Sequence, residues 1–394
     1  MKILHCSDLH LGRRPVGGIG KYSQLRYEDY FLSFKKCTDL AIKENVKVII
    51  ISGDFFDRRD LTPEIVERTE EILITIAKHG IQVIITEGNH DNIIAGKENE
   101  SWIIYLEKKD YLKHPKYYYD DKGFHFLPIS IDGLNFYGLG YPGSLVNETL
   151  KALSESISNN NENIILVHTA IASDEFLPGT VKKETIDLLK NKAIYIAGGH
   201  LHSYQFYPNE EPIFFVPGSP EYWDINEPID KKGFIIFDTE EKKFSFIKSN
   251  PRNKIEINFR SKSDNQEDFE EEFNSFISDI NYISEDDIVI ININLYKPFY
   301  INTSHYEDFL MKKGALKATI KLNLALYAED KSFINYMPTI QKVEKELIAS
   351  WEIFSHFTDK ILETLQKLKD YQRENQKEQF SECLDNMLDL VLNS

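Results

Sequence analysis

Side chains that can bind metals gather in five short motifs between Asp8 and His202. The motifs are Asp8-Leu9-His10, Gly53-Asp54, Gly88-Asn89-His90-Asp91, His168 and Gly199-His200-Leu201-His202. Imidazole together with carboxylate favours Mn²⁺, Fe²⁺ or Zn²⁺, whereas oxygen ligands alone would favour Mg²⁺. The motifs offer more ligands than one tetrahedral ion takes, but their number suits two ions that share a bridge. The candidate ligands are Asp8, His10, Asp54, Asn89, His168, His200 and His202.

Two divalent ions about 3.5–4 Å apart suit phosphoryl chemistry, because they activate a shared water, hold the phosphate and neutralise charge on the reacting oxygens. Asp54 can bridge through its two oxygens, and Asn89 adds a neutral amide oxygen that limits the negative charge. His90 points elsewhere if Asn89 faces the metal, so His90 is a candidate general acid for the leaving alkoxide. The remaining histidines belong to no motif and are interpreted as surface or core residues: His5, His79, His114, His125, His305 and His356. The motifs therefore predict a metal-dependent phosphoesterase.

The first 250 residues alternate short β-rich runs with helical stretches, which predicts an α/β sandwich. Strands are expected at Ile3–Cys6, Val46–Ile51, Gln82–Thr86, Ile164–Val167, Ile194–Ala197, Ile213–Val216 and Phe234–Phe237. Helices are expected over Glu28–Lys43 and from Thr62-Pro63 to Gly80, and Asp132-Gly133 predicts a hairpin within Phe126–Tyr137. Each motif follows a strand, and ligands in open α/β sheets gather at the carboxyl ends of strands. We therefore expect the five motifs to meet at one edge of the fold.

The character of the sequence changes after Pro251. A β-α-β-α-β module is expected from Ile255–Phe259, Gln266–Asp279, Asp287–Leu295, Ser304–Lys313 and Leu316–Leu324. From about Ala328 the sequence is polar and helical, with candidate helices at Trp351–Lys369 and Gln376–Leu392. The second helix has an apolar stripe of Phe380, Cys383, Leu384, Met387, Leu388 and Val391. The predicted domains are residues 1–250, 251–326 and 327–394.

Composition narrows the class of protein. The hydrophobic content of 42% and aromatic content of 12% are enough for packed cores, so global disorder is excluded. The net charge of −17 argues against DNA binding by bulk electrostatics, but it leaves a local basic strip or bound cations open. Cys6, Cys37 and Cys383 are far apart and odd in number, which fits a reducing cytoplasm rather than a disulfide framework or structural zinc. The sequence has no readable signal peptide. It also has no apolar run that approaches the roughly 18–20 residues needed to span a bilayer.

These motifs resemble those of the calcineurin-like metallophosphoesterase superfamily, and within it the Mre/SbcD family of DNA double-strand-break repair nucleases. Ser7–Gly12, Tyr141–Gly143 and Pro217–Glu221 carry the closer resemblance. The resemblance is strong over about residues 1–240, loose over 252–326 and only architectural beyond that. It implies a two-sheet metallophosphoesterase sandwich with a small α/β capping domain and a helical C-terminal tail.

The resemblance also implies a division of the ligands between two ions. One ion would be held by Asp8, His10, Asp54 and His202, and the other by Asp54, Asn89, His168 and His200. The implied ions are Mn²⁺, with Mg²⁺ or Fe²⁺ as alternatives, and His90 would assist the leaving group. The implied activity is that of a 3′–5′ exonuclease and structure-specific endonuclease in DNA repair and recombination, acting in the cytoplasm and at the nucleoid of a bacterium or archaeon.

Some members of this family have a histidine where this chain has Asp57. Our hypothesis is that Asp57 orients His90 and raises its basicity, as carboxylates do for catalytic histidines. The alternative is a cap or a salt bridge with Arg58 or Arg59. Replacing Asp57 with Asn should then lower turnover without loss of metal.

Two basic clusters follow the first two metal motifs and are candidates for contact with DNA phosphates. They comprise Arg13, Arg14 and Lys21 in the first cluster and Arg58 and Arg59 in the second. Solvated loop charge is the competing interpretation. Two competing functions stay open: a metallophosphoesterase that acts on phosphoesters other than DNA, and a non-catalytic scaffold for an ATPase. A nuclease that defends against foreign DNA is a variant of the DNA enzyme.

The expected partners are DNA, a second copy of the chain and an SbcC-type coiled-coil ATPase; no membrane is expected. The C-terminal apolar stripe fits docking onto a partner helix pair, and the alternative is a helix folded back on its own domain. Pro63–His79 and Trp102–Tyr111 are the candidate helices for a homodimer. Truncation after Ala328 should preserve nuclease activity and abolish ATPase binding.

Overall fold

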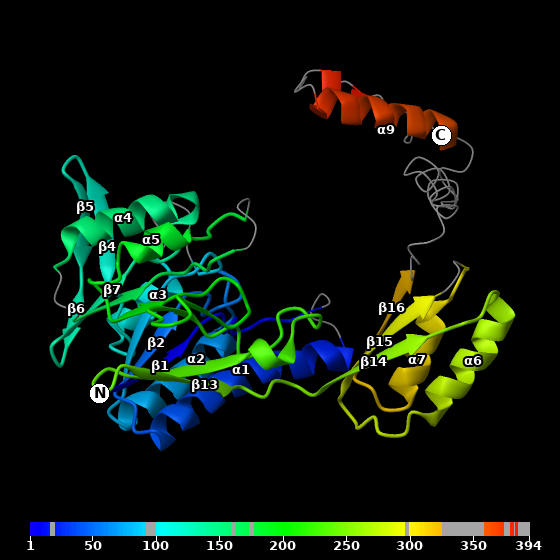
Figure 1. Ribbon diagram of the computed structural model, residues 1–394, viewed down its shortest axis with the longest axis horizontal. Coiled ribbons are helices and arrows are strands. Elements are labelled where there is room, and N and C mark those ends of the chain that lie inside the picture. The colour runs from blue at the N-terminus through cyan, green and yellow to red at the C-terminus, as the bar shows by residue number, and fades with distance from the viewer. Residues whose placement is uncertain are drawn as a thin grey trace. The chain divides into compact units, whose positions relative to one another are not determined.

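The computed structural model of the chain describes residues 1–15, 20–91, 100–158, 162–172, 177–295, 299–324, 358–373, 379–381 and 383–384 (Figure 1). These residues form two compact units. The first unit comprises Met1–Ser261, Gln266–Ile293 and Phe299–Leu322, so it contains the predicted domain 1–250 and most of 251–326. The second comprises Lys262–Asn265, Asn294–Pro298 and Asn323–Ser394. The site lies in the first unit.

Two mixed β-sheets form the centre of the first unit. The first sheet has the order β13-β12-β1-β2-β3, and its strands are β1 (Lys2–Cys6), β2 (Val48–Ser52), β3 (Gln82–Thr86), β12 (Gly233–Asp238) and β13 (Lys243–Lys248). The second has the order β10-β11-β9-β8-β7-β6, with β6 (Ile129–Ile131), β7 (Leu134–Gly138), β8 (Asn163–Leu166), β9 (Tyr195–Ala197), β10 (Gln205–Tyr207) and β11 (Phe214–Val216). In each sheet the central strands run parallel, so their carboxyl ends lie along one edge.

Buried apolar side chains join the sheets face to face and join the helices to their outer faces. The core between the sheets includes Ile3, Val48 and Ile50 from the first sheet, which pack with Ile164 and Phe215 from the second. Helices α1 (Gly20–Lys43), α2 (Pro63–Lys78) and α3 (Trp102–Lys108) cover the outer face of the first sheet, and α4 (Val146–Ser156) and α5 (Lys183–Asp187) cover that of the second (Figure 1). The α/β class predicted from the sequence is therefore confirmed.

Most of the expected elements appear within a few residues of their predicted bounds. Asp132 and Gly133 have φ of 49° and 82°, which is the conformation that a two-residue hairpin between β6 and β7 requires. Helix α1 begins at Gly20 rather than at the expected Glu28. The sequence did not indicate its first turns, because these turns bury polar side chains, including Arg26, that give no apolar signal. The hairpin of β4 (Lys116–Asp120) and β5 (Gly123–Leu127) was predicted only in part.

The predicted β-α-β-α-β module is present as β14 (Lys254–Arg260), α6 (Gln266–Asp279), β15 (Ile288–Leu295), α7 (Thr303–Lys312) and β16 (Lys317–Leu324). Its sheet has the order β14-β15-β16, and α6 buries Phe269, Phe273 and Ile277.

In the second unit, α9 spans Thr358–Arg373. The start of the expected helix Trp351–Lys369 and most of Gln376–Leu392 lie outside the described residues. Among the helices that the structure describes, none combines the length and apolarity that a membrane crossing needs.

Candidate metal centre

The ends of five strands bring the motif residues together at one edge of the two sheets. Asp8 and His10 follow β1, Asp54 follows β2 and Asn89 follows β3, while His168 follows β8 and His200 and His202 follow β9. Asp8, His10, Asp54 and His168 are almost completely buried. The structure thus gathers all seven candidate ligands, although they span almost 200 positions of the chain.

One group of side chains surrounds His10 and His202. The ligand atoms of Asp8, His10 and His202 all lie within 4.8 Å of one another. The Nε2 atoms of His10 and His202 are 3.2 Å apart, and His202 Nε2 is 3.8 Å from Asp8 Oδ1. Two imidazole nitrogens that face each other at this distance share a proton or a cation, and two imidazoles with a carboxylate form a ligand set that suits a divalent transition metal.

A second group surrounds His168. Its Nε2 atom lies 3.2 Å from Asp54 Oδ2 and 3.2 Å from Asn89 Oδ1. His200 Nδ1 is 3.1 Å from the same Asn89 oxygen. Asp54 Oδ2 also lies 3.9 Å from His10 Nε2, so one carboxylate oxygen faces both groups. The other oxygen, Oδ1, accepts the backbone N–H of His90 at 2.9 Å, and the bridge through both oxygens of Asp54 stays a prediction.

The backbone at four of these positions adopts the left-handed conformation that costs non-glycine residues about 1–3 kcal/mol each. Their φ values are 53° at Asp8, 45° at His10, 50° at Asp54 and 77° at His200. Hydrogen bonds between the loops hold this geometry, among them His10 N–H to the Asp54 carbonyl at 3.0 Å and His200 N–H to Asp8 Oδ1 at 3.1 Å. Strain at so many ligand positions is typical of a functional site.

Burial and charge act against each other on the ionisable groups. Burial alone would lower the pKa of His168, but the neighbouring Asp54 carboxylate outweighs it and raises that pKa to about 9. Burial raises the pKa of Asp54, yet His168 and His10 hold it well below its ordinary value. Burial also lowers the pKa of His10 far below its ordinary value. The centre is thus a close set of opposite charges, and a cation held by His168 and Asp54 would take the place of the proton on His168.

His90 lies beside the first group and is held by the backbone of Asp57. Its Nδ1 atom is 2.6 Å from the Asp57 carbonyl oxygen, and its ring centroid is 4.8 Å from that of His10. The Asp57 carboxylate instead accepts a hydrogen bond from Arg13 at 3.1 Å and lies 3.7 Å from His10 Nδ1. The sequence predicted that the side chain of Asp57 orients His90. In the structure the contact to His90 is made by the backbone carbonyl of Asp57 instead.

Asp91 has a structural role that the sequence analysis did not assign. Its buried carboxylate accepts the backbone N–H groups of Phe55 at 3.1 Å, Phe56 at 2.9 Å and Gly88 at 2.9 Å. It thereby ties the loop after β2 to the loop after β3. Burial and the charge of Asp54 raise the pKa of Asp91 to about 7. Its place in the Gly88–Asp91 motif was the available signal.

The basic residues divide into two kinds. Arg13 is packed over the Trp223 ring, 3.7 Å from its centroid, and Arg14 lies 3.7 Å from the ring centroid of Tyr27 while bonding Gln24. Arg58 and Arg59 are exposed, although Arg58 lies 3.8 Å from the Asp57 carboxylate. The second pair is thus placed to meet a ligand from solvent.

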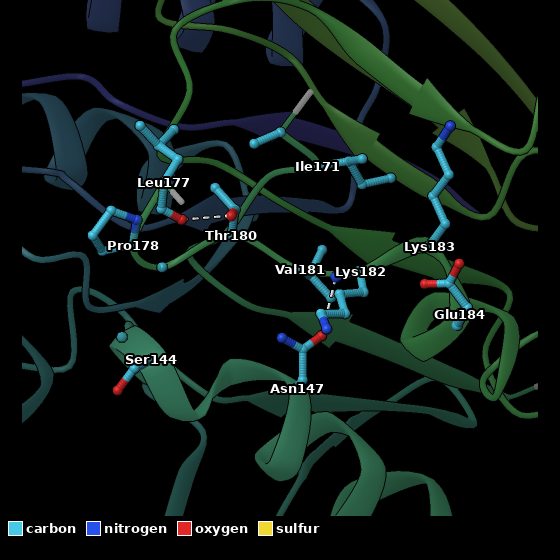
Figure 2. A pocket seen from close by; sticks show the side chains of 13 residues that line it. Ser144, Asn147, Ile171, Leu177, Pro178, Thr180, Val181, Lys182, Lys183 and Glu184 are labelled. Carbon is cyan, nitrogen blue, oxygen red and sulfur yellow. Dashed lines mark hydrogen bonds between the residues drawn. The ribbon is translucent and has the colours of Figure 1, made fainter. Parts of the chain in front are cut away.

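A hollow of about 430 Å³, whose lining side chains are drawn in Figure 2, adjoins the His200 side of the centre. Its wall includes Pro178, whose carbonyl oxygen is 3.2 Å from His200 Nε2, together with Asn147, Lys182 and Lys183. Asn147 Oδ1 accepts the backbone N–H of Lys182, which fixes this side of the wall (Figure 2).

Comparisons with known proteins agree with this geometry. A family model described as calcineurin-like phosphoesterase matches residues 1–204. The chain is 26% identical to the SbcD subunit of the nuclease SbcCD of Staphylococcus epidermidis, over 94% of this chain and 96% of that protein. It is 28% identical to the DNA double-strand break repair protein Mre11 of Sulfolobus acidocaldarius, over 60% of each chain. The Mre11 protein of Sulfurisphaera tokodaii is 31% identical over 56% of this chain and 54% of its own length. The chain thus spans less than two thirds of these two Mre11 relatives.

Two of the solved structures that match part of the chain do so with low similarity. TT1561 of Thermus thermophilus matches 63% of this chain and 99% of its own, with a TM-score of 0.38 and 14% identity. A dimetal phosphatase from Danio rerio matches 60% of this chain and 91% of its own, with a TM-score of 0.37 and 10% identity.

Proposed function

Because the chain belongs to the calcineurin-like phosphoesterase family, we propose that it is a two-metal nuclease that hydrolyses phosphodiester bonds of DNA. The observation that carries the proposal is the single Asp54 oxygen that faces two groups of ligands, 3.9 Å from His10 Nε2 and 3.2 Å from His168 Nε2. The printed names of the relatives, a subunit of the SbcCD nuclease and Mre11 repair proteins, support DNA as the substrate.

In this proposal the two groups of side chains hold one divalent ion each, most favourably Mn²⁺, with Mg²⁺ or Fe²⁺ as alternatives. One ion is held by Asp8, His10, Asp54 and His202, and the other by Asp54, Asn89, His168 and His200. Such a pair supplies the positive charge that activates water and stabilises the phosphoryl transition state. The chain's own part is to keep the ligand atoms in place, which the interloop hydrogen bonds do.

His90 acts as the general acid and donates a proton to the leaving alkoxide. Since the Asp57 carbonyl can only accept, His90 Nδ1 carries the hydrogen of that 2.6 Å contact, and Nε2 is the nitrogen left to exchange a proton. His90 stands next to the ligand His10, which puts this nitrogen at the edge of the centre. A positioned acid of this kind contributes about 10²- to 10⁴-fold to the rate.

DNA approaches the centre against the protein's overall charge of −17, so the isolated chain binds DNA weakly and with strong dependence on salt. Arg58 and Arg59 offer local positive charge beside the second motif. A partner then supplies much of the binding, and the alignment with the SbcD subunit over 94% of the chain supports an SbcC-type ATPase that docks on the C-terminal helices. We further propose a homodimer and a site of action in the cytoplasm, at the nucleoid. Truncation after Ala328 should abolish ATPase binding and preserve nuclease activity.

The proposal is tested by a Mn²⁺-dependent assay on end-labelled duplex and hairpin DNA. Wild type is compared with His90→Ala and with the matched control His79→Ala, which changes an exposed histidine at the end of α2. We expect cleavage by wild type and His79→Ala, and a loss of about 10²-fold or more in His90→Ala. Hydrolysis of a small phosphodiester without any cleavage of DNA would refute the nuclease and favour an enzyme for other phosphoesters.

A further inference from the structure

His202 makes a contact on the side away from the other candidate ligands. Its Nε2 atom faces His10 and Asp8, and its Nδ1 atom lies 2.7 Å from Oε1 of Glu227. Glu227 is in the loop after β11 and belongs to none of the metal motifs. The bond makes Nδ1 the protonated nitrogen and leaves the Nε2 lone pair directed at the metal group.

The second oxygen of Glu227 is also held. Glu227 Oε2 accepts the backbone N–H of Trp223 at 3.0 Å and lies 2.8 Å from Nζ of Lys232, whose side chain is completely buried. Lys232 Nζ also donates to the carbonyl oxygen of His202 at 3.1 Å and to Ser219 Oγ at 2.7 Å. Lys232 therefore contacts both partners of this hydrogen bond: the carboxylate of Glu227 and the backbone carbonyl of His202.

The other candidate histidine ligands are supported differently. His168 Nδ1 lies 2.8 Å from the Ser52 carbonyl oxygen, and His200 Nε2 lies 3.2 Å from that of Pro178. His10 Nδ1 is 3.7 Å from the Asp57 carboxylate, which is beyond hydrogen-bond distance. Among the candidate histidine ligands, all of which the structure describes, His202 alone thus has a carboxylate as hydrogen-bond acceptor for the ring nitrogen that faces away from the other ligands.

A largely buried lysine–glutamate pair gives little net stability, because the cost of removing two charges from water offsets their attraction. Its position behind a candidate ligand suggests a different benefit. A carboxylate that accepts from the second nitrogen of a ligand histidine fixes the ring and makes the metal-facing nitrogen a stronger ligand, and losing such a partner costs about 10- to 100-fold in metal affinity or activity.

We propose that Glu227, braced by Lys232, is a positioning residue that holds His202 for the ion shared with Asp8 and His10. This inference rests on the two-metal centre of the proposed function, but not on DNA being the substrate. It predicts that the two ions depend unequally on Glu227. The ion next to His202 weakens when Glu227 is changed, whereas the ion next to His168 does not.

The test measures Mn²⁺ binding to the DNA-free protein by titration calorimetry and electron paramagnetic resonance. In Glu227→Gln we expect one of the two affinities to fall about 10- to 100-fold. The spin-coupled signal of paired ions then gives way to the signal of an isolated ion at concentrations that still fill both sites in wild type. The matched control is Glu221→Gln, which neutralises a buried glutamate of the same loop that lies 3.0 Å from Arg26 and contacts no candidate ligand.

Glu227→Gln leaves Lys232 buried without its carboxylate partner and so lowers stability for a reason unrelated to metal. The double variant Glu227→Gln with Lys232→Met removes that unpaired charge. We expect it to recover thermal stability without recovering the lost metal affinity. Equal weakening of both ions, the same weakening in Glu221→Gln, or recovery of the affinity in the double variant would overturn the proposal. Absence of DNA cleavage by metal-loaded wild type would refute the nuclease instead and leave this inference standing.

Discussion

Replacement of Gly53 by alanine is expected to disable the centre without unfolding the protein. Gly53 links β2 to Asp54 and has a φ of 88°. A Cβ atom placed there would lie 2.3 Å from Nδ1 of His168 and 2.6 Å from its Cγ. Because ordinary contacts begin near 3.4 Å, the imidazole must retreat by about 1 Å. That movement breaks the 2.8 Å contact of His168 with the Ser52 carbonyl and carries Nε2 away from Asp54.

Gly53→Ala has two costs, the strain of the left-handed backbone and the displacement of His168, and a control variant separates them. The left-handed backbone itself costs an alanine roughly 1–2 kcal/mol of stability. Gly80 has a φ of 71°, and a Cβ atom placed there would meet nothing within 4 Å. Gly80→Ala therefore carries the backbone cost alone, whereas Gly53→Ala adds the displacement of a ligand, and a misplacement of 1 Å can cost about 10²-fold in rate.

The assay combines Mn²⁺-dependent hydrolysis of a small phosphodiester, Mn²⁺ titration and chemical denaturation. We expect Gly80→Ala to lose only the backbone cost and Gly53→Ala to lose more stability, because it also displaces a buried ring. Only Gly53→Ala should lose turnover, by about 10²-fold, together with affinity for the ion next to His168. Full activity in Gly53→Ala would mean that His168 is not a ligand or that the loop relaxes freely. Equal loss of activity in Gly80→Ala would mean that general destabilisation explains the effect.

Three further predictions concern Asp57, His5 and the exposed arginines. Asp57→Asn keeps the carbonyl that holds His90 but removes the carboxylate charge that binds Arg13 and lies 3.7 Å from His10 Nδ1. We therefore expect turnover to fall by about 10- to 100-fold with both ions retained in metal analysis, and loss of metal would contradict the assignment. Burial lowers the pKa of His5 from 6.5 to about 3, so the unfolded chain takes up a proton that the folded chain does not. Stability is complete above pH 6.5 and falls by about 1.4 kcal/mol per unit below it, and denaturation from pH 7 to 4 should give a smaller slope for His5→Gln. Replacing Arg58 and Arg59 with alanine should weaken DNA binding evenly across sequences and reduce the salt slope by about two, and an unchanged slope would show that neither residue meets a phosphate.

The location of the centre was predictable because its signals are local. Each candidate ligand follows a strand whose apolar run is readable, and the carboxyl ends of neighbouring parallel strands must lie side by side. The bounds of α6 match Gln266–Asp279, because its apolar residues repeat at helical spacing beside acidic ones. Local periodicity and strand order thus determine the layers and the edge at which the motifs meet.

The supports of the centre were not predictable, because their partners are distant in the chain. Asp91 belongs to a motif, but nothing in the local pattern marks which backbone groups it binds, and nothing local marks Glu227 at all. Glu227 lies 25 positions from His202, and Asp91 lies more than 30 positions from the amides of Phe55 and Phe56. The side-chain sulfur atoms of Cys6 and Cys37 are 3.7 Å apart although 31 positions separate them. Such contacts depend on how the layers pack, which a single sequence does not reveal.

Charge connects metal binding to substrate binding in this protein. Without cations, the buried carboxylates of Asp8, Asp54 and Asp57 meet an incoming phosphodiester in a chain with a net charge of −17, and like charges repel. Two bound divalent ions reverse the local sign while leaving the rest of the surface acidic. Under the proposed function, metal loading therefore raises the affinity for DNA, and by linkage DNA raises the affinity for metal by the same factor. The acidic surface then confines DNA binding to the loaded centre, to Arg58 and Arg59 beside it and to whatever basic surface a partner contributes. Cleavage therefore requires metal, and a partner increases the affinity for DNA.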